Sequence, residues 1–211
     1  MKIIDKLIPR GKYNRPGTKS VPKRVCVHYT GDPGASAERL ALFFCTNVNA
    51  TTSSQYVVGL EGEVIRCIPD DEIAYGASGK NAGTIHIEVC YKNADGRFEE
   101  PSVKALNELV LYLMARYHIA AKDVVRHYDL TGKRCPAYYV DAARWQELHE
   151  RITSNPAASA PAEKKLYRVQ VGAFSSRANA EKVKAAGFGG LWWRDNFLPR
   201  ASARGGVLTD I

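Results

Sequence analysis

The chain has 211 residues, of which 45% are hydrophobic and 25% charged, a composition that is ordinary for a globular protein with one full core and a small second module. Its longest apolar runs fall far short of the roughly 20 residues that cross a bilayer, so no transmembrane anchor is predicted. The formal net charge is +8, yet residues 1–24 and 164–211 are basic and the segment between them is net acidic. Basic ends of this kind suit a polyanionic surface, either nucleic acid or an anionic cell wall, or else form an ordinary solvated face.

Predicted strands and helices alternate through the first 150 residues. In chain order they are a strand at 24–30, a helix at 36–47, a hairpin at 54–69, a strand at 84–91, a helix at 102–118, a short strand at 123–130 and a helix at 140–152. Ser36 is placed to cap the first helix, and the hairpin is expected to turn near Glu61 and Gly62. These elements predict an α/β fold with a mixed central β-sheet flanked by helices.

One change of composition marks a domain boundary. Residues 153–165 are rich in Ala, Ser and Pro and lack both aromatic residues and periodicity, which is typical of a flexible linker. The predicted organisation is therefore a domain at 1–152, a linker at 153–165 and a short segment at 166–211. The first 20 residues contain early charges such as Lys2 and Asp5 and show no secretory signal pattern.

The five cysteines are odd in number and form no CxxC pair, which argues against a disulfide framework or a structural zinc knuckle. Four of them lie in apolar surroundings and are predicted to be buried thiols. Cys135 differs, because it lies in a predicted loop between Arg134 and Pro136.

Alternation along the strand at 84–91 singles out a carboxylate. Ile85, Ile87 and Val89 point to one face, so Glu88 points to the other, together with His86. A carboxylate in the middle of a strand is unfavourable to bury unless it is paired or functional, which makes Glu88 a candidate acid or base.

Three further side chains could bind a metal ion. His28 and His127 lie near predicted strand ends, and Cys135 lies in a loop. Three nitrogen or sulfur ligands are the number that a catalytic zinc takes while its fourth position stays open for water. Spacing alone leaves the alternative that each histidine is an ordinary core or surface residue.

The sequence resembles the zinc-dependent N-acetylmuramoyl-L-alanine amidases of the amidase-2 type, a family that includes phage endolysins and relatives of the peptidoglycan recognition proteins. Four motifs carry the resemblance, in the order and at the approximate separations of the family: "CVHYTG", "SSQYVVGLEGEVIRCIP", "NAGTIHIEV" and "RHYDLTGKRCP". It covers roughly residues 20–150.

The resemblance implies a role for each candidate residue. His28, His127 and Cys135 match the zinc ligands, Glu88 matches the general base, and Lys133 matches a lysine that faces the substrate carbonyl. The implied reaction is zinc-dependent hydrolysis of the amide bond between N-acetylmuramic acid and L-alanine in bacterial peptidoglycan, by a monomeric endolysin or autolysin. A protein of this kind would be made in the cytoplasm without a signal peptide and would act on the cell wall after release.

Two other classes of function stay open from the sequence. A metal-free protein of the same fold would bind peptidoglycan without cutting it, but the chain retains Cys135, Glu88 and Lys133. A nucleic-acid binder could use the basic ends but would not need that set of residues, so no nucleic acid is expected as a partner.

Three departures from the family pattern accompany the match. Ser54 and Gln55 stand where some branches carry a catalytic tyrosine, which leaves more of the chemistry to Glu88. Gly76 stands where many relatives have a histidine, and His86 stands where a small residue is usual. His86 either packs as a polar residue beside Glu88 or has a role in the cleft.

Residues 164–190 resemble the first half of a sporulation-related (SPOR) repeat, with a strand-like "YRVQVGAF" followed by a helix-like "SSRANAEK". Such domains bind glycan strands, which suits an amidase. The residues after Gly190 lack strand alternation and a second helix, so the predicted second unit is a short, incomplete α+β segment.

Overall fold

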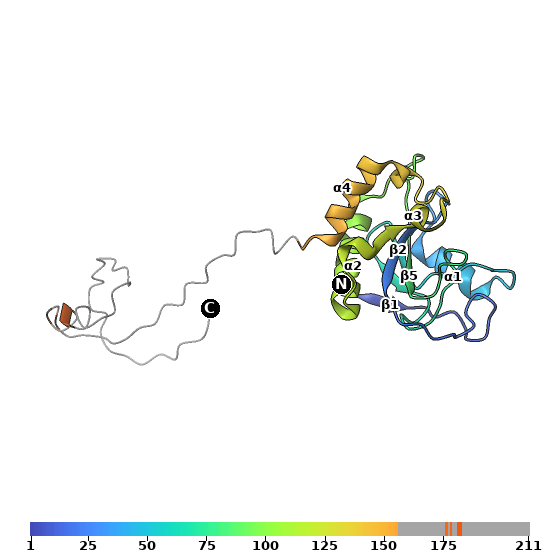
Figure 1. Ribbon diagram of the computed structural model, residues 1–211, viewed down its shortest axis with the longest axis horizontal. Coiled ribbons are helices and arrows are strands. Elements are labelled where there is room, and N and C mark those ends of the chain that lie inside the picture. Colours follow the sequence, from blue (N-terminus) through green and yellow to red (C-terminus); the bar gives the residue numbers. More distant parts are fainter. Residues whose placement is uncertain (156–175, 177, 179–180, 183–211) are drawn as a thin grey trace, which may run out of the picture. The chain divides into compact units, whose positions relative to one another are not determined.

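A six-stranded sheet organises the first 155 residues in the computed structural model (Figure 1). In chain order its strands are β1 (Ile3–Asp5), β2 (Arg24–Tyr29), β3 (Tyr56–Val58), β4 (Val64–Arg66), β5 (Thr84–Val89) and β6 (Val124–Arg126). They lie side by side in the order β1-β4-β3-β5-β2-β6. Only β3 and β4 pair antiparallel within this sheet, through the predicted hairpin, and the other neighbours pair parallel. The predicted mixed sheet is confirmed.

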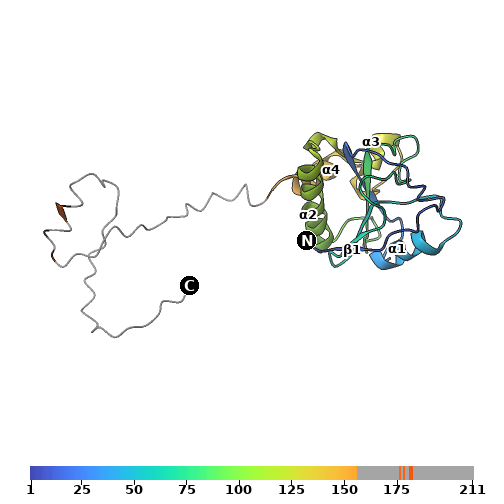
Figure 2. The ribbon, with the colours of Figure 1, turned by 90° about the horizontal axis from the view of Figure 1, so that it is seen from below.

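Helices cover both faces of the sheet. Within residues 1–155 they are α1 (Ala37–Thr46), α2 (Glu100–Tyr117), α3 (His127–Thr131) and α4 (Ala142–Thr153), with short 3-10 turns η1 (Ala121–Asp123) and η2 (Tyr138–Val140). Figures 1 and 2 show α2 and α4 together on one face and α1 on the opposite face. None of the helices in the described residues is both long enough and apolar enough to span a bilayer.

The larger core lies between the sheet and the pair α2 and α4. Residues three and four apart on α2, such as Leu106, Leu109 and Leu113, are fully buried against β-branched residues of the strands, among them Ile85 and Ile87. Each such side chain contributes roughly 1.5–3 kcal/mol when it leaves water. A smaller core lies under α1. Side chains of β2 and β5 that face away from the larger core are therefore free to form a site.

The structure corrects the predicted strand at 123–130. Strand β6 ends at Arg126, and His127 is the first residue of the one-turn helix α3. The Asp129 carboxylate accepts a hydrogen bond from the Arg126 backbone N–H at 2.8 Å, which caps the turn. Gly132 ends the turn with a φ of 75°, a conformation that glycine adopts without strain. His127 therefore lies at a helix start and not within a strand.

The structure describes residues 1–155 and, beyond them, residues 176, 178, 181 and 182. Contacts divide the chain into Met1–Ala162 and Glu163–Ile211. Most of the predicted linker and nearly all of the predicted SPOR-like segment lie outside the described residues.

Candidate metal centre and active site

The predicted site residues gather at the carboxyl ends of three adjacent parallel strands, β5, β2 and β6. His28 is the fifth residue of β2 and pairs in register with Glu88 of β5. Paired residues of neighbouring strands point to the same face, so the register places the carboxylate beside the imidazole. His127 follows β6 directly, and its ring centroid lies 4.6 Å from that of His28. This is the edge at which open α/β sheets bind ligands.

Three buried side chains converge there as a group that could hold a metal ion. His28, His127 and Cys135 each offer one ligand atom, and these atoms lie within 4.8 Å of one another. The Cys135 sulfur lies 3.7 Å from His28 Nδ1. Two such ligands on one tetrahedral zinc, with bonds of about 2.3 Å and 2.05 Å, would be about 3.6 Å apart. His127 Nδ1 is buried and has no hydrogen-bond partner among the described residues, so the group fits a metal ion.

Burial sets the protonation of these groups. It lowers the pKa of His28 well below its usual value, with smaller contributions from His86 and His127, and it also lowers the pKa of His127. Both rings are therefore neutral at pH 7, the form in which imidazole binds a metal. Burial, followed by the Glu88 charge, raises the pKa of Cys135 to about 12, although a hydrogen bond from the Tyr29 backbone opposes this. A coordinating cation deprotonates such a thiol.

The Cys135 side chain is only 3% exposed, so it is more buried than its predicted loop position suggested. Of the four cysteines that were predicted to be buried, three are buried and Cys45 is only partly buried. The sulfur is held close to the sheet because the Tyr128 backbone N–H donates to the Cys135 carbonyl at 2.9 Å. This bond closes the loop between α3 and Cys135 and brings two of the candidate ligands together.

Glu88 carries an unpaired carboxylate oxygen. Its Oε2 is buried without a hydrogen-bond partner in the described part of the chain, although the residue as a whole is only partly buried. Burial raises the pKa of Glu88 to about 8, and the positive charge of Lys133 acts in the opposite direction. A carboxyl group with a pKa near neutrality can both accept and return a proton at pH 7.

Lys133 lies on the exposed loop that follows α3. Its backbone carbonyl accepts a hydrogen bond from the Cys135 backbone N–H at 2.7 Å, and its positive charge contributes to lowering the pKa of His28, His127 and Glu88. The structure therefore brings four of the predicted site residues to one place and puts Lys133 on the exposed loop that leads to Cys135.

Arg126 is a positioning residue that the sequence analysis did not identify. Its guanidinium donates to the carbonyl groups of Tyr139 and Val140 at 2.7 and 3.0 Å and pairs with Asp129 at 2.7 Å. It also lies over the Trp145 ring, 5.3 Å from the ring centroid. These contacts fasten the start of α3 to η2 and α4. An arginine three residues before an aspartate was the only available signal in the sequence.

The structure also decides between the two interpretations of His86. Its side chain is fully buried, and its Nδ1 lies 2.9 Å from His28 Nε2, so it contacts a candidate ligand and is not open to a cleft. Ser54 and Gln55 are buried as well, and the hairpin tyrosine, Tyr56, directs its hydroxyl to Asp70. The hairpin therefore supplies no tyrosine to the site.

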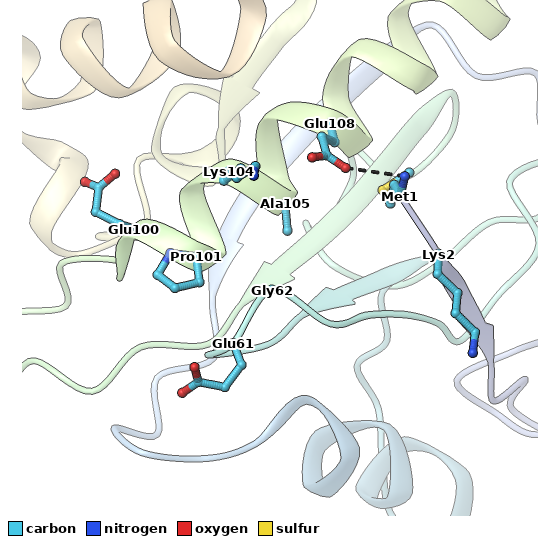
Figure 3. Close-up of a pocket in the computed structure, with 9 residues that line it drawn as sticks. All are labelled: Met1, Lys2, Glu61, Gly62, Glu100, Pro101, Lys104, Ala105 and Glu108. Atoms are coloured by element: carbon cyan, nitrogen blue, oxygen red, sulfur yellow. Dashed lines mark ion pairs between the residues drawn. The ribbon is translucent and has the colours of Figure 1, made fainter. Parts of the chain in front are cut away.

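A surface cavity of about 500 Å³ lies elsewhere in the domain (Figure 3). It is lined by Met1, Lys2, the hairpin turn and the first turns of α2, and none of the five site residues contributes to it. Glu108 pairs with the N-terminal amine at 3.4 Å on one side of this cavity. Its walls mix both signs of charge and contain no histidine or cysteine, so this cavity lacks the nitrogen and sulfur ligand set of the site at the strand ends.

A profile of the N-acetylmuramoyl-L-alanine amidase family, of the amidase-2 type, matches residues 18–138, the segment that holds all five site residues. The chain belongs to this family. A mutant endolysin from Bacillus subtilis is 34% identical with a TM-score of 0.64, and the match covers 72% of this chain and 98% of that one. The catalytic domain of XlyA is 33% identical with a TM-score of 0.63 and coverages of 72% and 99%.

Curated relatives of this amidase family are longer. A probable N-acetylmuramoyl-L-alanine amidase from Bacillus licheniformis is 33% identical over 171 residues, which is 73% of this chain and 48% of the relative. The chain thus spans about half the length of the curated relatives it matches. A SPOR domain profile matches residues 140–189, beginning at the last residue of η2 and running through α4.

Proposed function

We propose that the chain is a zinc-dependent N-acetylmuramoyl-L-alanine amidase, which hydrolyses the amide bond between N-acetylmuramic acid and L-alanine in bacterial peptidoglycan. The observation that carries the proposal is the convergence of three buried nitrogen and sulfur atoms beside the unpaired Glu88 carboxylate. Membership of the amidase family supports it, as does the nearly complete coverage of a mutant endolysin and of the catalytic domain of XlyA.

The mixed nitrogen and sulfur ligand set favours zinc over magnesium or calcium, which prefer oxygen ligands. His28, His127 and Cys135 would hold the ion. Zinc bound by three protein ligands supplies a Lewis acid and makes a water molecule reactive at neutral pH.

Glu88 and Lys133 would supply the remaining chemistry. Glu88 would accept a proton from the attacking water and deliver it to the leaving amine of L-alanine, because its unpaired carboxylate oxygen lies beside His28 and the Lys133 charge favours its ionised form against the effect of burial. The Lys133 ammonium would stabilise the negative charge that grows on the carbonyl oxygen. Removing one such stabilising group typically lowers the rate by about 100-fold or more.

The SPOR match adds a proposed partner. We propose that the part of the chain beyond the amidase domain binds glycan strands, so that the enzyme acts at the cell wall on both the glycan and its stem peptide. The basic character of residues 164–211 is consistent with an anionic wall as the target.

The test is analysis of wall fragments released by the purified chain, with and without chelator. An amidase releases stem peptides with a free L-alanine amino group and leaves the glycan uncut. We expect this release to stop with chelator and to return with zinc, at about one zinc per chain, and to be absent in Cys135→Ala. The appearance of new reducing sugar ends would show that the enzyme cuts a glycosidic bond of the glycan and not the amide bond. Wall binding without any release would favour the recognition protein.

A further inference from the structure

His86 makes a contact that neither its position on β5 nor the proposed reaction explains. Its ring is completely buried, and its Nδ1 lies 2.9 Å from His28 Nε2. Two nitrogen ligands of one tetrahedral zinc would lie about 3.3 Å apart, so 2.9 Å indicates a hydrogen bond between the rings and not a shared metal ion.

The direction of this hydrogen bond follows from the other nitrogen of His28. Its Nδ1 faces the Cys135 sulfur at 3.7 Å and is therefore the atom available to a metal ion. A neutral imidazole that binds a metal through Nδ1 carries its proton on Nε2. His28 Nε2–H is the donor, and His86 Nδ1 is the acceptor.

We infer that His86 is a positioning residue for the metal centre: it accepts the hydrogen bond from His28 and so fixes the tautomer and the ring orientation that present Nδ1 to the ion. This inference rests on the proposed function. Such partners behind a metal-binding histidine typically contribute 10–100-fold to metal affinity.

His86 is itself held firmly enough to orient another ring. Its backbone N–H donates to Gln55 Oε1 at 2.7 Å, and its carbonyl accepts from the Gln55 backbone N–H at 3.1 Å. Gln55 Nε2 in turn donates to the Glu72 carbonyl at 2.8 Å. Two hydrogen bonds thus join the His86 backbone to Gln55, one to its anchored side chain and one to its backbone, and they leave His86 little freedom to move away from His28.

Packing alone does not account for a histidine at this position. His86 Nε2 is buried without a hydrogen-bond partner among the described residues. A phenylalanine would fill similar space and would leave no polar atom unpaired, so the histidine is retained at an energetic cost. The hydrogen bond to His28 is the interaction that a phenylalanine could not make.

Gly76 makes room for the ring. A Cβ atom at position 76 would lie 2.5 Å from His86 Cγ, closer than nonbonded carbon atoms approach. The Gly76 backbone does not adopt a positive φ, so the obstacle to a larger residue is the His86 ring itself. Two of the three departures from the family pattern, Gly76 and His86, are therefore neighbours, and the absence of a side chain at position 76 allows the imidazole at position 86.

The test compares zinc affinity in His86→Phe and His86→Asn, measured on the full chain by competition with a chromophoric chelator. Phenylalanine keeps the ring but cannot accept a hydrogen bond, whereas the asparagine Oδ1 takes the place of Nδ1 as an acceptor. We expect a 10–100-fold loss of zinc affinity in His86→Phe and recovery of most of that loss in His86→Asn. Equal affinity in the parent and His86→Phe would overturn the inference.

Gly76→Ala gives an independent arm if His86→Phe does not fold. The three atoms nearest to the new methyl group would all belong to His86, so the ring must shift and zinc affinity should fall in the folded protein, together with some loss of thermal midpoint because the ring is buried; unchanged affinity would count against the inference. Cys26, His28 and His86 also form a second group with the spacing of metal ligands. Two zinc ions per chain would make His86 a ligand and would also overturn its positioning role. A parent chain that binds no zinc would reject the proposed function together with the inference.

Discussion

At the scale of single residues, the carboxylate of Glu88 is the sharpest test of the proposed chemistry. Its buried oxygen has no hydrogen-bond partner among the described residues and its pKa is raised toward neutrality, which suits a group that exchanges protons, and neither property is needed for the fold. Glu88→Gln keeps the shape but cannot accept a proton, so we expect zinc content and thermal midpoint to persist while turnover on muropeptides falls by roughly 10²–10⁴-fold.

The matched control is Glu61→Gln, which removes an exposed carboxylate at the hairpin turn and should leave turnover unchanged. Turnover of Glu88→Gln within a few-fold of the parent would mean that another group accepts the proton.

The sequence singled out the candidate site residues for two reasons: Glu88, His28, His127 and Cys135 are unusual residue types for their positions, and Lys133 matches a family motif. Glu88 interrupts an apolar strand, and His28 and Cys135 belong to recognisable motifs. The contact between His86 and His28 could not be predicted, because 58 residues separate them and the contact depends on the register of β2 with β5. The room that Gly76 leaves for the His86 ring could not be predicted either, because a glycine in a sequence does not show which side chain packs against it.

At the scale of elements, α3 with the loop after it decides whether the proposed metal centre can form. This short segment carries both His127 and Cys135, and a single turn of helix has little stability of its own. The Arg126 guanidinium supplies the missing support through its bonds to the Tyr139 and Val140 carbonyls. The positions of two proposed ligands therefore depend on the side chain of Arg126, which is not one of the candidate ligands.

Arg126→Lys tests this dependence. Lysine keeps the charge but cannot form the planar fork that reaches two carbonyls and Asp129 together. We expect zinc affinity to fall by about 10-fold or more, since misplaced ligands bind a metal weakly. Arg144→Lys is the matched control, because Arg144 lies over the nearby Tyr138 ring and is exposed. Equal zinc affinity in both variants would show that α3 is held by other contacts.

The boundaries of long elements with a sustained hydrophobic periodicity could be predicted, whereas those of short elements could not be predicted as well. The helix predicted at 102–118 is α2, shifted by two residues at its start. Strand β1 was not predicted, because three residues at a sheet edge show no alternation and its pairing with β4 is a long-range contact. The strand at 123–130 was overextended for a different reason: the cap that Asp129 provides outweighs the β-branched residues before it.

At the scale of the whole molecule, the position at which the amidase domain ends can be argued from the core. Leu148 and Ile152 on α4 are 2% and 0% exposed and pack in the core shared with α2. The SPOR profile nevertheless begins at residue 140, before this helix. Removing both side chains from the core would cost roughly 3–6 kcal/mol, which is a large fraction of the stability of a domain of this size. We therefore assign α4 to the amidase domain.

Two truncated chains test this assignment and the role of the remaining residues. A chain that ends at Ser154 keeps α4, and we expect it to retain the thermal midpoint and the hydrolysis of soluble muropeptides. A chain that ends at Tyr139 should unfold or have a much lower thermal midpoint, because it lacks Leu148 and Ile152.

The Ser154 chain loses nine Lys and Arg against three acidic residues in 164–211, so its adsorption to intact walls should weaken at low salt. The difference in adsorption from the full chain should shrink at high ionic strength, where such attraction is screened. Loss of soluble activity in the Ser154 chain would place part of the catalytic domain beyond α4.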